Sequence, residues 1–198
     1  MYVVFDTETT GLPRSRKAAV SDVYNWPRIV QIAWEVFDGR DQKTDSHAYI
    51  IRPDGFTIPK DAERVHGIST SIAKKSGVPV AEALNAFARV LSQSTVVVGH
   101  NLKFDTDILS AECYRLGMDD PLSRMRHCCT MLATTQFCGL PGRYNGYKWP
   151  TLPELYLKLF KTTVKEVHEA AADVATCSKC FFELKRRGVV RIAAVRGA

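Results

Sequence analysis

The stretch Tyr2-Val-Val-Phe-Asp-Thr-Glu-Thr-Thr-Gly-Leu12 opens with a β-branched and aromatic run and then carries two acidic residues. The run from Tyr2 to Phe5 is typical of a buried strand. Residues i and i+2 of a strand point to the same face, so Asp6 and Glu8 are predicted to project together. Two carboxylates this close repel unless a cation lies between them, and oxygen ligands favour Mg²⁺ or Mn²⁺. A solvated strand end is the alternative interpretation of the pair.

Two further strand signals follow this stretch. Residues 29–37 (Ile-Val-Gln-Ile-Ala-Trp-Glu-Val-Phe) predict a long strand, and residues 45–51 predict a strand that returns beside it. Asp38-Gly39, between the two, is a hairpin signal. The segment before residue 29 has little periodicity and contains Arg14, Arg16 and Lys17, so it is predicted to be a basic loop. Three successive strands predict an antiparallel meander.

The rest of the chain alternates between helix and strand signals. Helices are expected over residues 80–92, 104–116, 130–137, 152–160 and 170–187, and strands over residues 95–98 and 125–129. A meander followed by this alternation predicts an α/β protein with a mixed five-stranded sheet, antiparallel at first and parallel afterwards, and helices packed on it. No repeat or linker interrupts the pattern, so residues 1–198 are predicted to form a single domain.

The composition is typical of a globular protein. The 198 residues are 45% hydrophobic and 24% charged, which excludes disordered and collagen-like chains. No apolar run approaches the roughly 18 residues of a membrane span, and the first residues do not form a signal peptide. Six cysteines without such a signal predict free thiols in a reducing compartment, the cytoplasm, nucleoid or nucleus, and no secretion. The net charge of +6 suits a polyanionic partner and is equally compatible with simple solubility.

A third acid follows the strand predicted over residues 95–98. Asp105 ends the segment Gly99-His-Asn-Leu-Lys-Phe-Asp105, where that strand turns into a helix. If the sheet is parallel there, Asp105 lies beside the first strand, and ligands of open α/β sheets collect at the carboxyl ends of the strands. An ordinary Asp at a helix start, stabilised by the helix dipole, is the alternative.

The segment Val167-His-Glu-Ala-Ala-Ala-Asp173 adds a histidine and a fourth acid. On one helix, His168 and Asp173 would be separated by about 140°, so they converge only if His168 lies on the loop before the helix. The three alanines would then let the helix approach the sheet closely. A histidine beside a metal site suits general-base chemistry because its pKa is near neutrality. A surface histidine followed by an acid in the first helical turn is the alternative.

Taken together, the three acidic segments resemble the motifs of the DEDDh (DnaQ-like) family of 3′→5′ exonucleases, the proofreading type. Residues 4–12 match the first motif, residues 100–105 the second and residues 168–173 the third. A tyrosine-type relative would carry Tyr four residues before the last acid, where this chain has Glu169. His168 therefore indicates the histidine subclass.

The resemblance implies a ribonuclease H-like fold and an enzyme that hydrolyses terminal phosphodiesters of nucleic acid, with DNA favoured, to nucleoside 5′-monophosphates. Four acids would hold two Mg²⁺ ions, for which Mn²⁺ would substitute, and His168 would be the general base. These acids are Asp6, Glu8, Asp105 and Asp173. Residues 64–69 (Arg-Val-His-Gly-Ile-Ser) resemble the family's substrate-binding segment. The implied substrate contacts are Thr7, Leu12, Val65, His66, Ile68, Asn101 and Phe104, although ordinary core packing is the alternative for the apolar ones.

The implied partner is a nucleic acid with a free 3′ end, single-stranded or frayed, and not a membrane. A polymerase partner is expected to be a separate chain, because this sequence contains no polymerase domain. The alternatives are an RNA-trimming exonuclease of the same family and a catalytically silent nucleic-acid-binding domain, and the intact set of four acids and one histidine argues against the silent domain. The aromatic and basic stretch Asn145-Gly-Tyr-Lys-Trp-Pro150 is predicted to be a loop that stacks on bases, shapes the rim of a cleft, or packs on itself.

Overall fold

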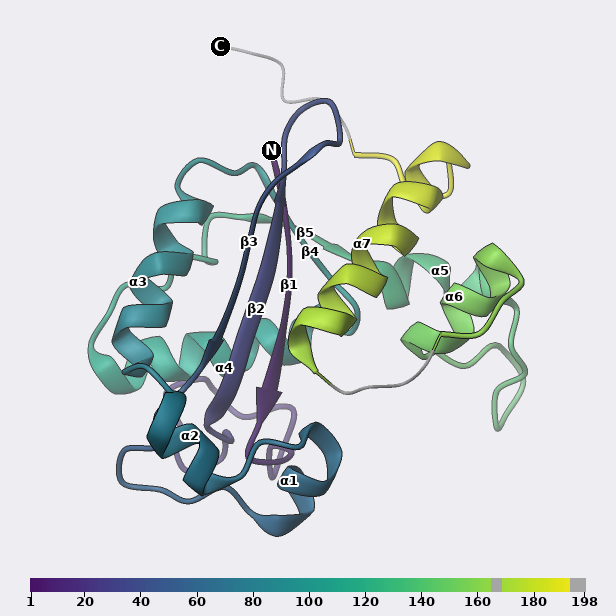
Figure 1. Ribbon diagram of the computed structural model, residues 1–198. Helices are drawn as coiled ribbons and strands as arrows, with labels where there is room; N and C mark the ends of the chain where they lie inside the picture. Colours follow the sequence, from purple (N-terminus) through teal and green to yellow (C-terminus); the bar gives the residue numbers. More distant parts are fainter. Residues whose placement is uncertain (165–168, 193–198) are drawn as a thin grey trace.

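A mixed sheet runs through the centre of the protein (Figure 1). The computed structural model describes residues 1–164 and 169–192. The five strands are β1 (Tyr2–Thr9), β2 (Ile29–Phe37), β3 (Lys43–Ile50), β4 (Val96–Gly99) and β5 (Arg126–Cys129), in the spatial order β3-β2-β1-β4-β5. The pairs β1–β2 and β2–β3 are antiparallel, whereas β1–β4 and β4–β5 are parallel. The predicted meander followed by parallel strands is confirmed.

Helices cover both faces of the sheet and one of its ends. The five predicted helices are present, with boundaries that shift by at most two residues: α3 (Val80–Leu91), α4 (Leu102–Leu116), α5 (Thr130–Cys138), α6 (Leu152–Phe160) and α7 (Ala170–Arg186). Two further helices, α1 (Lys60–His66) and α2 (Thr70–Ser76), lie at the end of the sheet toward which β1 points (Figure 1). Each has only seven residues, about two turns, and this is too short for the apolar periodicity that identifies a helix in a sequence.

Alternation along β1 and β2 separates two hydrophobic cores. Phe5 and Trp34 face α3 and α4, and both rings pack against Phe87 of α3 at centroid distances of 5.0 and 5.1 Å. Val4 faces the opposite side, where Phe181 and its neighbours on α7 form the second core with α5 and α6. Every residue of β2 is buried because helices cover both faces of this strand.

The same alternation puts Asp6 on the α7 face of β1, two residues beyond the fully buried Val4. Ala170 is also fully buried at the start of α7, and its N–H donates to Oε1 of Gln31 on β2 at 3.0 Å. The small side chain and this hydrogen bond hold the first turn of α7 against the sheet. The predicted close approach of helix and sheet is confirmed at Ala170.

The loop between β1 and β2 is held by a buried ion network. Glu112 of α4, only 1% exposed, accepts hydrogen bonds from Nε of Arg28 at 2.8 Å and from the N–H of Ile29 at 3.2 Å. Arg115, one turn further along α4, is ion-paired with Glu112 and donates to the carbonyl oxygens of Val23 and Trp26 at 2.5 and 2.6 Å. Arg115 therefore fixes the loop to α4. Among the described residues, no helix combines the length and the apolar character needed to cross a membrane.

Candidate active site

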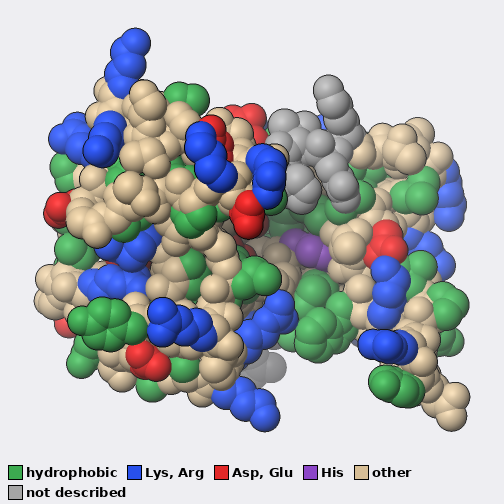
Figure 2. Space-filling view, turned by 90° about the horizontal axis from the view of Figure 1, so that it is seen from below, with side chains coloured by type: hydrophobic (Ala, Val, Ile, Leu, Met, Phe, Trp, Pro, Cys, Tyr) green, Lys and Arg blue, Asp and Glu red, His purple; other side chains and the backbone are tan. Residues whose placement is uncertain are grey.

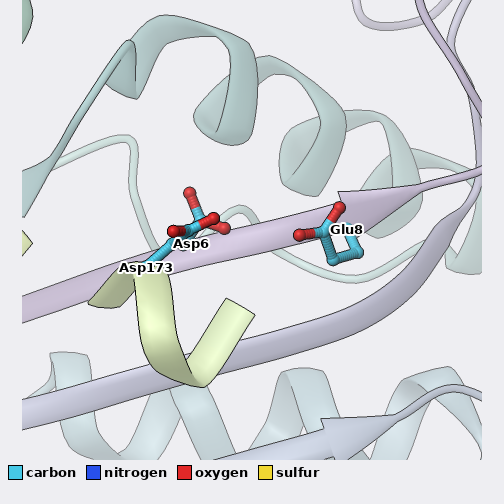
Figure 3. A group of neighbouring side chains, drawn as sticks. All are labelled: Asp6, Glu8 and Asp173. Atoms are coloured by element: carbon cyan, nitrogen blue, oxygen red, sulfur yellow. The ribbon is translucent and has the colours of Figure 1, made fainter. Parts of the chain in front are cut away.

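Three carboxylates meet where the carboxyl-terminal half of β1 faces the first turn of α7. One oxygen each of Asp6, Glu8 and Asp173 lies within 4.8 Å of the other two. The carboxyl groups of Asp6 and Asp173 lie together, with Glu8 farther along β1 (Figure 3). The i, i+2 spacing on the strand and the packing of α7 on β1 together produce this cluster. Carboxylate oxygens at this separation suit a hard divalent cation.

Burial and mutual repulsion raise the pKa of each carboxyl group on β1. The pKa of Asp6 lies well above its usual range, chiefly because the group is buried and then because Asp105, Glu8 and Asp173 are negatively charged nearby. Burial, followed by the charges of Asp173 and Asp105, raises the pKa of Glu8 to about 8. A cation held between these groups would favour their ionised forms. The electrostatics of the cluster thus match a metal site.

Asp105 lies beside the cluster and is oriented by β1. Its carboxylate is 2% exposed and accepts hydrogen bonds from the N–H and the hydroxyl group of Thr7 at 3.2 and 2.7 Å. Burial raises the pKa of Asp105 to about 7, although the bonds from Thr7 oppose the rise. Asp105 is not one of the three residues whose oxygens lie within 4.8 Å, but its charge acts on both Asp6 and Glu8. The structure therefore places the fourth predicted acid next to the other three.

Thr7 is predicted from the sequence to contact the substrate, but its side chain has another partner. It is 6% exposed, and its hydroxyl group donates to Asp105. In this structure Thr7 positions a candidate ligand. His168 lies outside the described residues, so its role as general base stays a prediction; the described part of α7 begins at Ala170.

The predicted substrate-binding segment divides into exposed and buried residues. Leu12 is 73% exposed and Val65 is 53% exposed, so the core alternative is wrong for both. Ile68 is 7% exposed and packs in a small core with Val30 of β2, so the core alternative is right for this residue. His66 is also 7% exposed, and its Nδ1 accepts a hydrogen bond from the N–H of Ile68 at 3.1 Å. Leu12 and Val65 are thus free to contact a ligand, although neither is in the lining of the cleft described next.

A cleft of about 530 Å³ opens over the acid cluster. It is lined by Asp6, Arg16, His100, Asn101, Met131, Trp149, Pro150, Thr151, Leu152, Pro153 and Asp173. Seen from below relative to Figure 1, this face of the molecule is hollowed, and basic side chains lie on both sides of the hollow (Figure 2). The cleft is large enough for part of a polymeric substrate.

His100 forms hydrogen bonds to two segments that border this cleft, the start of α5 and the loop before α6. Its Nδ1 lies 2.9 Å from the hydroxyl oxygen of Thr130 at the start of α5, and its Nε2 donates to the carbonyl oxygen of Pro150 at 2.9 Å. Burial lowers the pKa of His100 below its ordinary value, which favours a neutral ring. The sequence placed His100 in a motif but assigned it no role, because its partners are 30 and 50 residues away. Asn101, the next residue, lines the cleft and adopts a left-handed conformation (φ 64°) that starts α4.

Comparison with known proteins identifies the family. The family model described as Exonuclease (RNase_T) matches residues 3–181, which is most of the chain. The chain belongs to this exonuclease family. The resemblance to DnaQ-like exonucleases predicted from the three acidic segments is confirmed.

Relatives and solved structures agree with this assignment. The chain is 31% identical to the DNA polymerase III subunit epsilon of Treponema pallidum over 91% of its own length and 74% of the relative. It is 28% identical to an epsilon-like protein of Rhodobacter capsulatus, of which it covers 25%. Its fold is similar to that of E. coli exonuclease I in complex with a dT13 oligonucleotide (TM-score 0.72, 19% identity), with 94% of this chain and 41% of that one covered. The predicted ribonuclease H-like fold is confirmed, and the chain spans about two fifths of exonuclease I.

Proposed function

We propose that this member of the exonuclease family is a metal-dependent 3′→5′ exonuclease of the DEDDh type, which releases nucleoside 5′-monophosphates and favours DNA. The observation that carries the proposal is the meeting of Asp6, Glu8 and Asp173, from two distant parts of the chain, with Asp105 beside them. Three clustered acids repel one another when they are ionised, so at neutral pH they lower the stability of the fold unless a cation or a bound proton offsets their charge. The proposal would fail if these carboxyl groups did not lie close together in the folded protein.

The donor set fits two divalent cations, Mg²⁺ or Mn²⁺, held by Asp6, Glu8, Asp105 and Asp173. When bound, such ions would neutralise charge on the phosphate and make the attacking water more acidic. Thr7 keeps Asp105 in place through two hydrogen bonds. His168 accepts the proton of the attacking water in this proposal, because a neutral imidazole is an effective base near pH 7.

The exposed apolar residues support cleavage at an end of the nucleic acid rather than within it. Leu12, three residues beyond the end of β1, and Val65 of α1 present their side chains to solvent, where they would contact a terminal nucleotide. DNA is favoured over RNA in this proposal because exonuclease I is solved with a DNA oligonucleotide and the Treponema pallidum relative is a DNA polymerase III subunit. By analogy with the epsilon relatives, a polymerase on a separate chain is the proposed protein partner.

The test is digestion of 5′-labelled single-stranded DNA and RNA of the same sequence with Mg²⁺. We expect a ladder that shortens from the 3′ end, release of mononucleotides, faster loss of the DNA and no reaction in EDTA. Asp6→Ala is the control for contaminating nucleases. Cleavage of a circular single strand would show an endonuclease, and preferential loss of the RNA would support the RNA-trimming alternative.

A further inference from the structure

An apolar groove of about 300 Å³ adjoins the cleft over the acids. It is lined by Pro13, Arg16, Trp26, Asn101, Lys103, Phe104, Asp107, Met131, Leu132 and Trp149. Arg16, Asn101, Met131 and Trp149 line both the groove and the cleft, so the two spaces are continuous. A chain-like substrate that fills the cleft over the acids therefore has the groove next to it.

The walls of the groove are aromatic and are held in place. Nε1 of Trp26 donates to the carbonyl oxygen of Ala19 at 2.9 Å, and its own carbonyl oxygen accepts a bond from Arg115. Trp149, which lines both the groove and the cleft, stands between two anchored residues of the chain. Lys148 is ion-paired with Glu154 at 2.6 Å, and Pro150 accepts a hydrogen bond from His100.

Trp149 is 56% exposed even though its neighbours in the chain are fixed. Leu132 of α5, which lines the same groove, is 54% exposed. Large apolar side chains that remain exposed around a hollow mark a binding surface. Flat aromatic side chains in such a place provide a platform for nucleobases, because every base has a face that can stack.

The charges at the groove suit a phosphate. Arg16 is exposed, and within residues 1–164 and 169–192 it forms no ion pair. Lys103 is paired with Asp107 of the same helix at 2.7 Å. Asp107 offsets the charge of Lys103, whereas no acid offsets the charge of Arg16 among the described residues. The rim of the groove therefore has a net positive charge, which would attract the phosphate backbone of a nucleic acid.

We propose that this groove is a second base subsite, which stacks the unpaired base of the nucleotide immediately 5′ of the terminal one against Trp149. Leu12 and Val65 hold the terminal nucleotide, the acids lie at the phosphate between the two nucleotides, and Arg16 contacts the next phosphate. This inference rests on the proposed exonuclease function. It assigns the substrate as a single-stranded 3′ end at least two nucleotides long, because a base stacked in the groove has left its partner strand.

Binding without turnover tests the subsite. We would titrate the protein into 5′-labelled single-stranded DNA in EDTA at low salt and follow fluorescence anisotropy. A stacked base contributes about 1–3 kcal/mol, so Trp149→Ala is expected to weaken binding by about 5- to 150-fold, and Trp149→Phe to restore most of it. Tyr144→Ala is the matched control, because Tyr144 lies in the same loop, is 83% exposed and is outside the groove lining. Binding of a mononucleotide, measured by calorimetry, should be the same in wild type and Trp149→Ala.

The position of the base is tested with an abasic nucleotide placed second from the 3′ end. Removing this base should weaken binding by the wild type by the same factor as the Trp149→Ala substitution weakens binding of the intact strand. Trp149→Ala should bind the abasic strand and the intact strand equally well. Equal binding by wild type and Trp149→Ala, or a Trp149 effect tied to another position, would overturn the subsite. Neither result bears on Mg²⁺-dependent digestion by the wild type, so failure of the subsite and failure of the exonuclease assignment are separable.

Discussion

Replacing Glu8 by Gln should make the metal-free protein more stable while abolishing its activity. Glu8 has a pKa of about 8 in the folded protein, against an ordinary value of 4.5. Between these two values the folded protein keeps a proton that the unfolded chain has lost, so its stability falls as pH rises from 4.5 to 8. The loss grows by about 1.4 kcal/mol per pH unit and amounts to about 3 kcal/mol at pH 7.

Glu8→Gln removes this penalty but buries a neutral amide in its place, so we expect a net gain of about 1–3 kcal/mol at pH 7. For a protein of this size that corresponds to a rise in Tm of about 2–12 °C. The gain should be small at pH 5, where the wild-type carboxyl group is protonated in the folded protein and only partly ionised in the unfolded chain.

The assay is thermal unfolding followed by circular dichroism in EDTA at pH 5, 6, 7 and 8. Glu82→Gln, an exposed glutamate on α3, is the matched control and should leave Tm unchanged. Addition of Mg²⁺ at about 100 times Kd should raise the free energy of unfolding of the wild type by about 2.7 kcal/mol and so raise its Tm. The Tm of Glu8→Gln should rise much less. A Tm for Glu8→Gln that lies below the wild-type value at pH 8 in EDTA would refute the reasoning.

Three further predictions concern the other acids and the histidine. Asp105→Ala should lose most nuclease activity in the Mg²⁺ digestion assay and keep its fold by circular dichroism; near-normal turnover with saturating metal would remove it from the ligand set. His168→Ala should lower turnover about 10²–10⁴-fold, with metal affinity retained in a calorimetric titration, and full turnover at neutral pH would exclude it as the base. Glu112→Ala should lower the free energy of unfolding in urea by about 3–5 kcal/mol, because it leaves the guanidinium group of Arg115 half-buried without its partner, whereas exposed Asp61→Ala should have little effect.

The strands and the longer helices were predictable because their signals are local. The nine residues of β2 include seven apolar ones and are all buried, and α3 carries its buried residues at helical spacing. The i, i+2 placement of Asp6 and Glu8 follows from strand geometry alone. The family resemblance also needed only the chain, because its three motifs are short and keep a fixed order. The helices α1 and α2 were missed because seven residues are too few to display a period.

Only the tertiary structure decided which side chains share a site and which do not. The carboxyl groups of Asp6 and Asp173 come together because the buried Ala170 lets α7 dock on β1, and this distance depends on the packing of residues far apart in the sequence. In the same way, the sequence could not show whether the Thr7 side chain binds Asp105 or contacts the substrate. The place of Trp149 beside Phe104 arises from His100 and Glu154, which hold its loop against the acidic cleft. Local patterns specify the faces of strands and helices, whereas long-range packing determines which faces meet.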